Sequence, residues 1–251
     1  MHLEKIKGKI PQHPYKAVPA GGKQMKVAVI GPICKDDNIV RGKSFSHIGG
    51  VTYYTGKALS CLGFNVTIFG SFGKESKIWL KPLEKCQIIH IPADGTIKFV
   101  NEYPHKSSDY RVQRADVHDN TVKTQHIASY NFDNFDFIVL GPLIQGNVGK
   151  PLVEKLLSRN RKAKFFLTVS GMLRCSQKGK IIRKIDGELM KVLPLIDYVL
   201  LDYDELRFIT GLNSVKSAVD FLQAKGAQNL LLTMGSRGSI VIKGSKSFNI
   251  Q

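Results

Sequence analysis

Residues 49–70 read GGVTYYTGKALSCLGFNVTIFG, and they combine a double glycine, a helix-like segment and a strand-like segment. The apolar positions of the middle segment keep helical spacing: Tyr54, Ala58, Leu59 and Leu62. The segment NVTIFG (65–70) is rich in β-branched and aromatic residues, which is typical of a strand. The stretch therefore predicts a helix over 50–62 followed directly by a buried strand.

The letters GK within this stretch do not form an ATP phosphate loop. A Walker A loop needs four residues between its glycines and a Ser or Thr after its Lys. Here five residues separate Gly50 from Gly56, and Ala58 stands at the hydroxyl position. Two interpretations remain open for the double glycine. It is either a helix start that faces a ligand with free N–H groups, or a plain turn before a core helix.

The same alternation of strands and helices continues along the chain. Further strand-like runs lie at 25–31, 86–91, 135–141, 164–170, 197–202 and 229–235. Helical segments are expected between them at 74–85, 147–160, 186–196 and 214–226. Strands that are apolar on both faces indicate a parallel sheet covered by helices on both sides. We therefore expect an α/β fold, a three-layer doubly wound, mostly parallel sheet, with ligands at the carboxyl ends of the strands.

Composition limits the classes of protein that the chain can belong to. The 251 residues carry a net charge of +17, and four scattered cysteines show no metal-ligand spacing. No apolar run approaches membrane-spanning length, and the N-terminus lacks a signal-peptide core, so we expect a cytoplasmic protein without a membrane partner. Residues 1–24 read as a flexible basic arm. The positive charge is spread along the chain, which predicts only non-specific contact with nucleic acid.

Two segments interrupt the α/β rhythm of the main domain at 25–251. Residues 38–48 and 95–128 alternate polar and apolar side chains in short pieces, which predicts a small antiparallel β lid. A lid near the carboxyl ends of the strands would cover a ligand. The alternative is an edge hairpin without a role in binding, and a third option is a homodimer that pairs through the lid.

Several ordered motifs together resemble the ribokinase-like sugar kinases, also called the PfkB family. The resemblance runs from Met25 to the end of the chain. It rests on a first strand VAVIG followed by Asp36, the double glycine, VTIFGSFG, DYVLLDYDELRFITG at 197–211 and LLLTMGSRGSIV at 230–241. The variants GGVTYY and TVSGMLR are most similar to the branch that acts on inositol or nucleosides. The resemblance implies transfer of the ATP γ-phosphate to a hydroxyl of a sugar, polyol or nucleoside.

The resemblance also implies roles for individual residues. It places the substrate against Asp36, Gly49, Gly50, Tyr54 and Arg174. It places the nucleotide against Thr233, Gly235 and Gly238, and Mg²⁺ near Glu205 and Asp202. From the residues alone, a turn residue beside Asp37 is the favoured interpretation of Asp36. The glycines of 235–238 are as readily a hairpin turn, and Glu205 a helix N-terminal acid favoured by the dipole.

The sequence departs from the family pattern at several points. Asp202 stands where the family has Asn, and Thr168 and Ser170 replace two polar residues of a middle motif. The signature Gly-Ala-Gly-Asp, which carries the anion hole and the catalytic base, does not occur before the last residue, Gln251. We therefore expect no catalytic residue within these 251 positions and no turnover. The alternatives are a ligand-binding pseudokinase without catalysis, a truncated product of a longer gene, and a basic nucleic-acid-binding protein.

Overall fold

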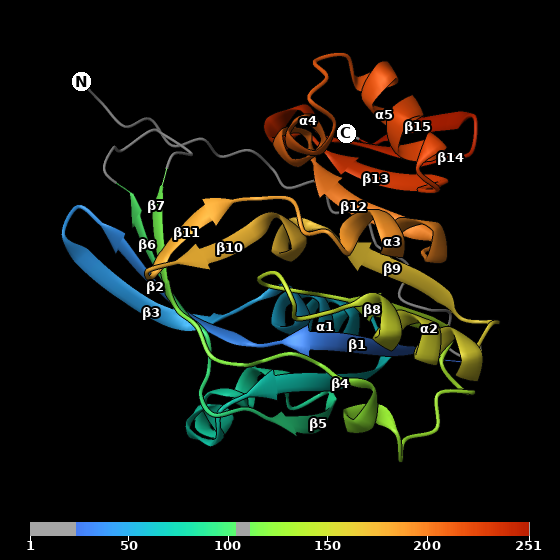
Figure 1. Ribbon diagram of the computed structural model, residues 1–251. Coiled ribbons are helices and arrows are strands. Elements are labelled where there is room, and N and C mark those ends of the chain that lie inside the picture. Colours follow the sequence, from blue (N-terminus) through green and yellow to red (C-terminus); the bar gives the residue numbers. More distant parts are fainter. Residues whose placement is uncertain (1–23, 104–110, 251) are drawn as a thin grey trace, which may run out of the picture.

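The computed structural model describes residues 24–103 and 111–250 (Figure 1). The expected N-terminal arm lies outside this range apart from Gln24. Within the described chain, a nine-stranded sheet forms the centre of the main domain in the order β15-β14-β13-β12-β9-β8-β1-β4-β5. The strands from β13 to β5 pair in parallel, and the hairpin of β14 and β15 closes one side in antiparallel fashion. Their bounds are β1 (Lys26–Pro32), β4 (Asn65–Phe72), β5 (Gln87–Pro92), β8 (Phe137–Leu140), β9 (Lys164–Thr168), β12 (Tyr198–Asp202), β13 (Asn229–Thr233), β14 (Ser239–Lys243) and β15 (Lys246–Ile250).

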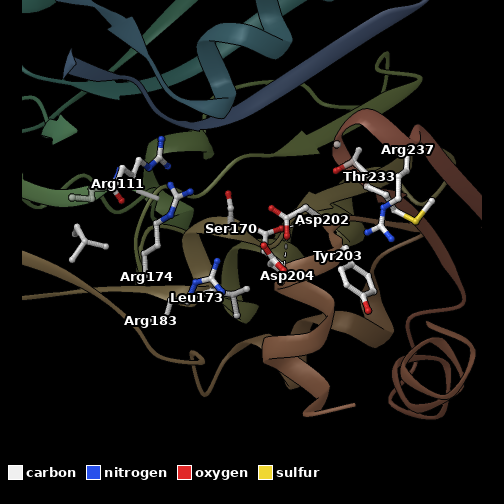
Figure 2. A pocket seen from close by; sticks show the side chains of 15 residues that line it. Arg111, Ser170, Leu173, Arg174, Arg183, Asp202, Tyr203, Asp204, Thr233 and Arg237 are labelled. Atoms are coloured by element: carbon white, nitrogen blue, oxygen red, sulfur yellow. Dashed lines mark hydrogen bonds between the residues drawn. The ribbon is translucent and has the colours of Figure 1, made fainter. Parts of the chain in front are cut away.

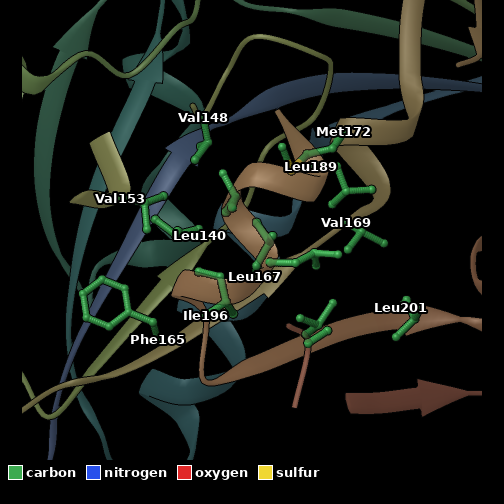
Figure 3. Close-up of a cluster of buried hydrophobic side chains, with 14 of the residues drawn as sticks. Leu140, Val148, Val153, Phe165, Leu167, Val169, Met172, Leu189, Ile196 and Leu201 are labelled. Atoms are coloured by element: carbon green, nitrogen blue, oxygen red, sulfur yellow. The ribbon is translucent and has the colours of Figure 1, made fainter. Parts of the chain in front are cut away.

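Strand β1 shows why the sheet is covered on both faces. Val27 and Val29 belong to one buried cluster, whereas Ala28 and Ile30 belong to another. Side chains alternate across a strand, so an uninterrupted apolar run must bury both faces. Helix α1 packs in the first cluster, and α2, α3, α4 and α5 contribute to the second, part of which is shown in Figure 3. The helix bounds are α1 (Val51–Cys61), α2 (Lys150–Arg159), α3 (Leu189–Val192), α4 (Tyr203–Thr210) and α5 (Val215–Ala224). The α/β fold with a mostly parallel sheet is confirmed.

Two expected helices take a different form. Residues 74–85 form the 3₁₀-helices η1 (Lys74–Trp79) and η2 (Lys81–Leu83) in place of one helix. Residues 186–196 contain only the short α3 and the 3₁₀-helix η5 (Leu193–Leu195). Each segment contains a proline, Pro82 or Pro194, which removes a backbone donor and clashes with the preceding turn. The spacing of apolar residues alone does not reveal where a helix is interrupted.

A second, six-stranded sheet forms the lid within the described residues, in the order β10-β11-β7-β6-β2-β3. It is wider than expected and is not purely antiparallel, since β2 and β6 run parallel. The segment 117–128 lies outside it and includes the 3₁₀-helix η3 (Thr124–Ile127), whereas the hairpin of β10 and β11 was not anticipated. The bounds are β2 (Cys34–Val40), β3 (Lys43–Gly49), β6 (Lys98–Tyr103), β7 (Val112–Asp116), β10 (Arg174–Gln177) and β11 (Lys180–Arg183).

A small apolar cluster fixes the lid to the main domain. It joins lid residues to the loop that follows β8, and its buried members are Cys34, Ile97, Phe99, Ala115, Leu143 and Ile144. The root of the lid is therefore packed, and the strands extend from it over the carboxyl ends of the main sheet (Figure 1). In the described part of the chain, no helix is both long and apolar enough to cross a membrane.

Candidate functional site

A cavity of about 740 Å³ lies where the lid meets the carboxyl ends of the central strands. Its floor comes from segments that follow β9, β12 and β13, and its lid side comes from β7, β10 and β11 (Figure 2). In parallel sheets the carboxyl ends gather loops from successive strands at one edge, which is where ligands bind. The volume is within the usual range for a small-molecule site.

The acidic floor of the cavity is built by the start of α4. The Asp202 side chain accepts a hydrogen bond from the Glu205 backbone N–H at 2.7 Å, and the Glu205 side chain accepts one from the Asp202 N–H at 3.0 Å. This reciprocal capping box fixes both carboxylates at the N-terminus of the helix. Burial raises the pKa of Glu205, and the charge of Asp202 adds to this, while Arg174 and Arg183 oppose it.

These carboxylates fit a magnesium ion that is shared with phosphate oxygens. No group of three or more potential metal-binding side chains occurs among the residues that the structure describes. Mg²⁺ commonly binds through one or two carboxylates, water and substrate phosphates, so it needs no cage made entirely of protein. Asp202 and Glu205 line the cavity, and each uses one named oxygen in the capping box. Their other carboxylate oxygens are chemically suitable for a phosphate-bound cation.

The expected substrate residues form a separate corner beside the cavity. The Asp36 carboxylate accepts a hydrogen bond from the Cys34 thiol at 3.6 Å and lies 3.9 Å from His47 Nε2. A Cβ atom on Gly49 would overlap the Asp36 carboxylate, so only glycine leaves room for this side chain. Gly50 adopts a φ of 98° at the start of α1, where a residue with a side chain is strained.

Tyr54 and Arg174 both lie close enough to Asp36 for their charges to interact with its carboxylate. Burial raises the pKa of Tyr54, and the nearby charge of Asp36 adds to the effect. Burial also raises the pKa of Asp36, against the opposing charges of His47, Arg111 and Arg174. Arg174 lines the cavity, whereas Asp36, Gly49, Gly50 and Tyr54 do not. The structure thus brings these four residues together and places Arg174 between their corner and the cavity.

The expected nucleotide residues lie on the opposite side of the acidic floor. Thr233 and Gly235 line the cavity, whereas Gly238 does not. Gly238 instead closes the turn, since its carbonyl accepts a hydrogen bond from the Met234 N–H at 2.9 Å. Gly235 and Gly238 have φ values of 59° and 85°, which explains glycine at both positions. The turn contributes backbone and a hydroxyl to the cavity, and Gly238 supports it from behind.

Several residues of the cavity were not anticipated from the sequence. Arg237 lies within the glycine turn and stacks over the Tyr203 ring at 5.2 Å from its centroid. Arg111 directly precedes β7, Gln113 belongs to β7, and Arg183 ends β11. The two β-branched residues Ile181 and Ile182, which follow Gly179, are the sign in the sequence that Arg183 belongs to a strand after a turn. No sign in the sequence indicated that the arginines converge.

Comparison with known proteins places this geometry in a family. The profile of the pfkB family carbohydrate kinases matches residues 26–251. No curated protein matches the chain by sequence. Among solved structures, a pyrophosphate-dependent kinase of the ribokinase family, complexed with a pyrophosphate analog and myo-inositol, is similar with a TM-score of 0.78 and 20% identity. The match covers 90% of this chain and 78% of that one.

Two further structures share the fold at lower identity. Ribokinase from Arabidopsis thaliana, complexed with ribose and ATP, has a TM-score of 0.65 and 14% identity, over 91% of this chain and 78% of that one. Adenosine kinase from Sinorhizobium meliloti has a TM-score of 0.69 and 12% identity, over 90% and 80%. The structures show a common ribokinase-like fold, and the family profile spans nearly the whole described chain. The chain belongs to the pfkB family of carbohydrate kinases.

Proposed function

We propose that this chain is an ATP-dependent kinase that transfers the γ-phosphate to a hydroxyl of a sugar, polyol or nucleoside. The observation that carries the proposal is the arrangement around the cavity. A corner with a carboxylate and glycines lies beside Arg174, which lines the cavity. The glycine turn lies across the acidic floor from Arg174 (Figure 2). An acceptor and a phosphoryl donor can therefore approach each other beneath the lid.

In the acceptor half, Asp36 supplies the group that binds hydroxyls. An ionised carboxylate accepts hydrogen bonds from hydroxyl groups with added strength from its charge. Gly49 allows the carboxylate its position, and Gly50 exposes backbone at the start of α1. Tyr54, whose side chain is half exposed, adds a hydroxyl near the same carboxylate. Together these groups suit a small ligand with several hydroxyls.

In the donor half, Thr233 and Gly235 would present a hydroxyl and backbone to the phosphates, and Asp202 and Glu205 would hold the magnesium ion. Mg²⁺, when bound, neutralises charge that develops on the transferring phosphoryl group. The residues of the chain position the reactants and exclude water through the lid, which is the main contribution that a phosphoryl-transfer enzyme makes.

A donor and acceptor screen tests this proposal. Purified chain is incubated with Mg²⁺–ATP and, in parallel, Mg²⁺–pyrophosphate, because a similar structure is that of a pyrophosphate-dependent kinase. The acceptors are myo-inositol, ribose and adenosine. Their binding is measured by the shift in melting temperature, and phosphorylated products are measured separately. We expect acceptor binding that Asp36→Asn weakens and Gly187→Ala leaves unchanged, since Gly187 faces open space. ATP-dependent product would overturn the expectation of no turnover and show that a residue of this chain acts as the base. Absence of both binding and product for every acceptor refutes the proposal.

A second candidate is ligand binding without turnover. Its supporting observation is that Thr168 and Ser170 replace two polar residues of the family's middle motif, and that Ser170 lines the cavity. Under this candidate an acceptor raises the melting temperature through Asp36, yet turnover remains well below about one per second, the lower end for kinases. The screen separates the two candidates because it measures binding and product independently.

We also propose that two copies pair through the lid. Strand β3 stands at one end of the lid sheet, and Phe45 of this strand is 57% exposed. Open strand edges readily pair with another chain. Light scattering after size exclusion should show a dimer that Phe45→Lys dissociates. Leu62→Lys is the control, since Leu62 is 41% exposed at the end of α1 and belongs to no lid strand, and equal behaviour of both variants contradicts lid pairing.

A further inference from the structure

Two arginines of the lid face each other without an acidic residue between them. Arg174 and Arg183 are directly opposed in the antiparallel pair of β10 and β11, and both line the cavity. Like charges at opposed positions of a sheet destabilise the strand pair. Such a pair is therefore unfavourable for the lid itself, which suggests that it serves a ligand.

A third arginine joins them from the neighbouring strand. Arg111 directly precedes β7, lines the same cavity, and its charge lowers the pKa of Arg174, although burial is the larger cause. Figure 2 shows Arg111, Arg174 and Arg183 together on one side of the cavity. We call these three residues the arginine cluster. The positive charges of the cluster are close enough to repel one another, as the effect of Arg111 on the pKa of Arg174 indicates.

The arginine cluster has no direct ion pair with the described part of the protein, although Glu205 and Asp36 act on Arg174 from a longer distance. Among residues 24–103 and 111–250, no carboxylate lies within ion-pair distance of any of the three guanidinium groups. The polar contact of Arg111 is with the Tyr103 hydroxyl at 3.3 Å, and Arg183 lies over the Phe208 ring at 5.7 Å. By contrast Arg114, on the same lid sheet, pairs with Glu102 at 3.8 Å.

The position of the cluster indicates which reactant it meets. The charges of Arg111 and Arg174 act on Asp36, the carboxylate of the acceptor corner. The turn with Thr233 and Arg237 lies on the far side of the acidic floor in Figure 2. Arginines bind phosphate oxygens with paired hydrogen bonds in a fixed geometry, which makes a cluster of them suitable for a phosphate group.

We propose that Arg111, Arg174 and Arg183 bind a phosphate group that the acceptor already carries. The acceptor is then a phosphate monoester of a small polyhydroxylated compound: its hydroxyls meet Asp36, and its phosphate meets the arginine cluster. This rests on the proposed function for the acceptor corner. The same phosphate chemistry could instead come from the terminal phosphoryl group of the donor, and the experiment separates these two sources.

The first arm measures the anion site with inorganic phosphate at constant ionic strength, by calorimetry and by melting temperature. Arg183→Gln and Arg174→Gln should each weaken phosphate binding by about tenfold or more. Without phosphate, each variant should melt at the same or a higher temperature, because the opposed like charges are removed. Arg114→Gln, the matched control on the lid, should bind phosphate as the unmodified chain does.

The second arm compares neutral compounds with their monoesters, namely myo-inositol with myo-inositol 1-phosphate, ribose with ribose 5-phosphate, and adenosine with AMP. We expect at least one ester to bind about tenfold more tightly than both its neutral partner and inorganic phosphate, because it occupies both subsites. Asp36→Asn should weaken the ester and leave inorganic phosphate unchanged. Arg183→Gln should remove the preference for the ester.

Each arm has an outcome that overturns the inference. If Arg183→Gln and Arg114→Gln weaken phosphate binding to the same extent, the binding comes from the general positive charge of the protein. The arginine cluster is then not a phosphate site. If phosphate binding depends on the cluster but no ester binds more tightly than inorganic phosphate, the cluster binds the phosphate of the donor. This outcome overturns the assignment to the acceptor. These readouts need no turnover, so failure of the kinase assay does not affect them.

Discussion

Substitution of Gly49 by alanine tests the acceptor corner without a change of charge. The added methyl group would occupy the position of the Asp36 carboxylate, which must then move. The backbone of Gly49 does not have a positive φ, so alanine is not excluded by backbone strain. The effect of Gly49→Ala should therefore come from displacement of Asp36.

The expected magnitudes for stability and binding differ, which makes the variant informative. Overpacking costs about 1–3 kcal/mol, whereas loss of glycine freedom in the unfolded chain stabilises by about 0.4–1 kcal/mol. The net destabilisation is at most about 2.6 kcal/mol, or roughly 5–10 °C in melting temperature for a chain of this size. Loss of a charge-assisted hydrogen bond from Asp36 costs about 1.5–3 kcal/mol, which is a factor of about 10–150 in ligand affinity.

The assay is a titration of myo-inositol, ribose, adenosine and their monoesters, well below the melting temperature of the variant. Gly187→Ala is the matched control, since a methyl group there meets no atom within 4 Å. We expect the control to bind as the unmodified chain does and Gly49→Ala to bind at least tenfold more weakly. Undiminished affinity in Gly49→Ala would refute the role of the Asp36 corner in acceptor binding.

Three further expectations concern the helix cap, pH and salt. Asp202→Ala should lower the free energy of unfolding by about 1 kcal/mol through loss of the N-cap, against about 0.3 kcal/mol for Asp204→Ala, as measured by urea unfolding. Because burial raises the pKa of Asp36, ligand affinity should fall as pH decreases through a value above the usual aspartate range near 4. The contribution of Asp36 to folding stability has the opposite pH dependence. It is fully present below the pKa that Asp36 has in the unfolded chain, and it is lost as pH rises through the pKa in the folded chain. Asp36→Asn should remove the pH dependence of both ligand affinity and stability. Affinity for random duplex DNA should fall steeply between low and physiological salt, and tight sequence-selective binding at physiological salt would contradict the metabolic proposal.

The central sheet was predictable from the sequence because its strands are apolar on both faces. Val27 to Ile30 are all buried, and short continuous apolar runs of this kind are typical of parallel strands covered by helices. The lid was only partly predictable, since strands with one exposed face give a weaker pattern and 174–183 was not recognised as a hairpin. The prolines at 82 and 194 shortened two expected helices, a local effect that apolar spacing does not register.

The candidate site was predictable only where a family motif marked it. The resemblance led to Asp36, the double glycine and Arg174, which the structure places near one another. Arg111 and Arg183 belong to no motif, and they meet Arg174 only because strands from distant parts of the chain join in one sheet. Side-chain convergence of this kind depends on tertiary pairing, which local sequence patterns do not contain.

The discontinuous lid has a consequence for how the protein forms during synthesis. The strands of the lid come from 34–49, 98–116 and 174–183, so the sheet is incomplete until the ribosome has added Arg183. Pairings between such distant segments form slowly, after local ones. Until β11 arrives, β7 presents an open edge that can pair with another nascent chain. Translation pauses or chaperone contact near this point should therefore decide how much of the newly made protein escapes aggregation.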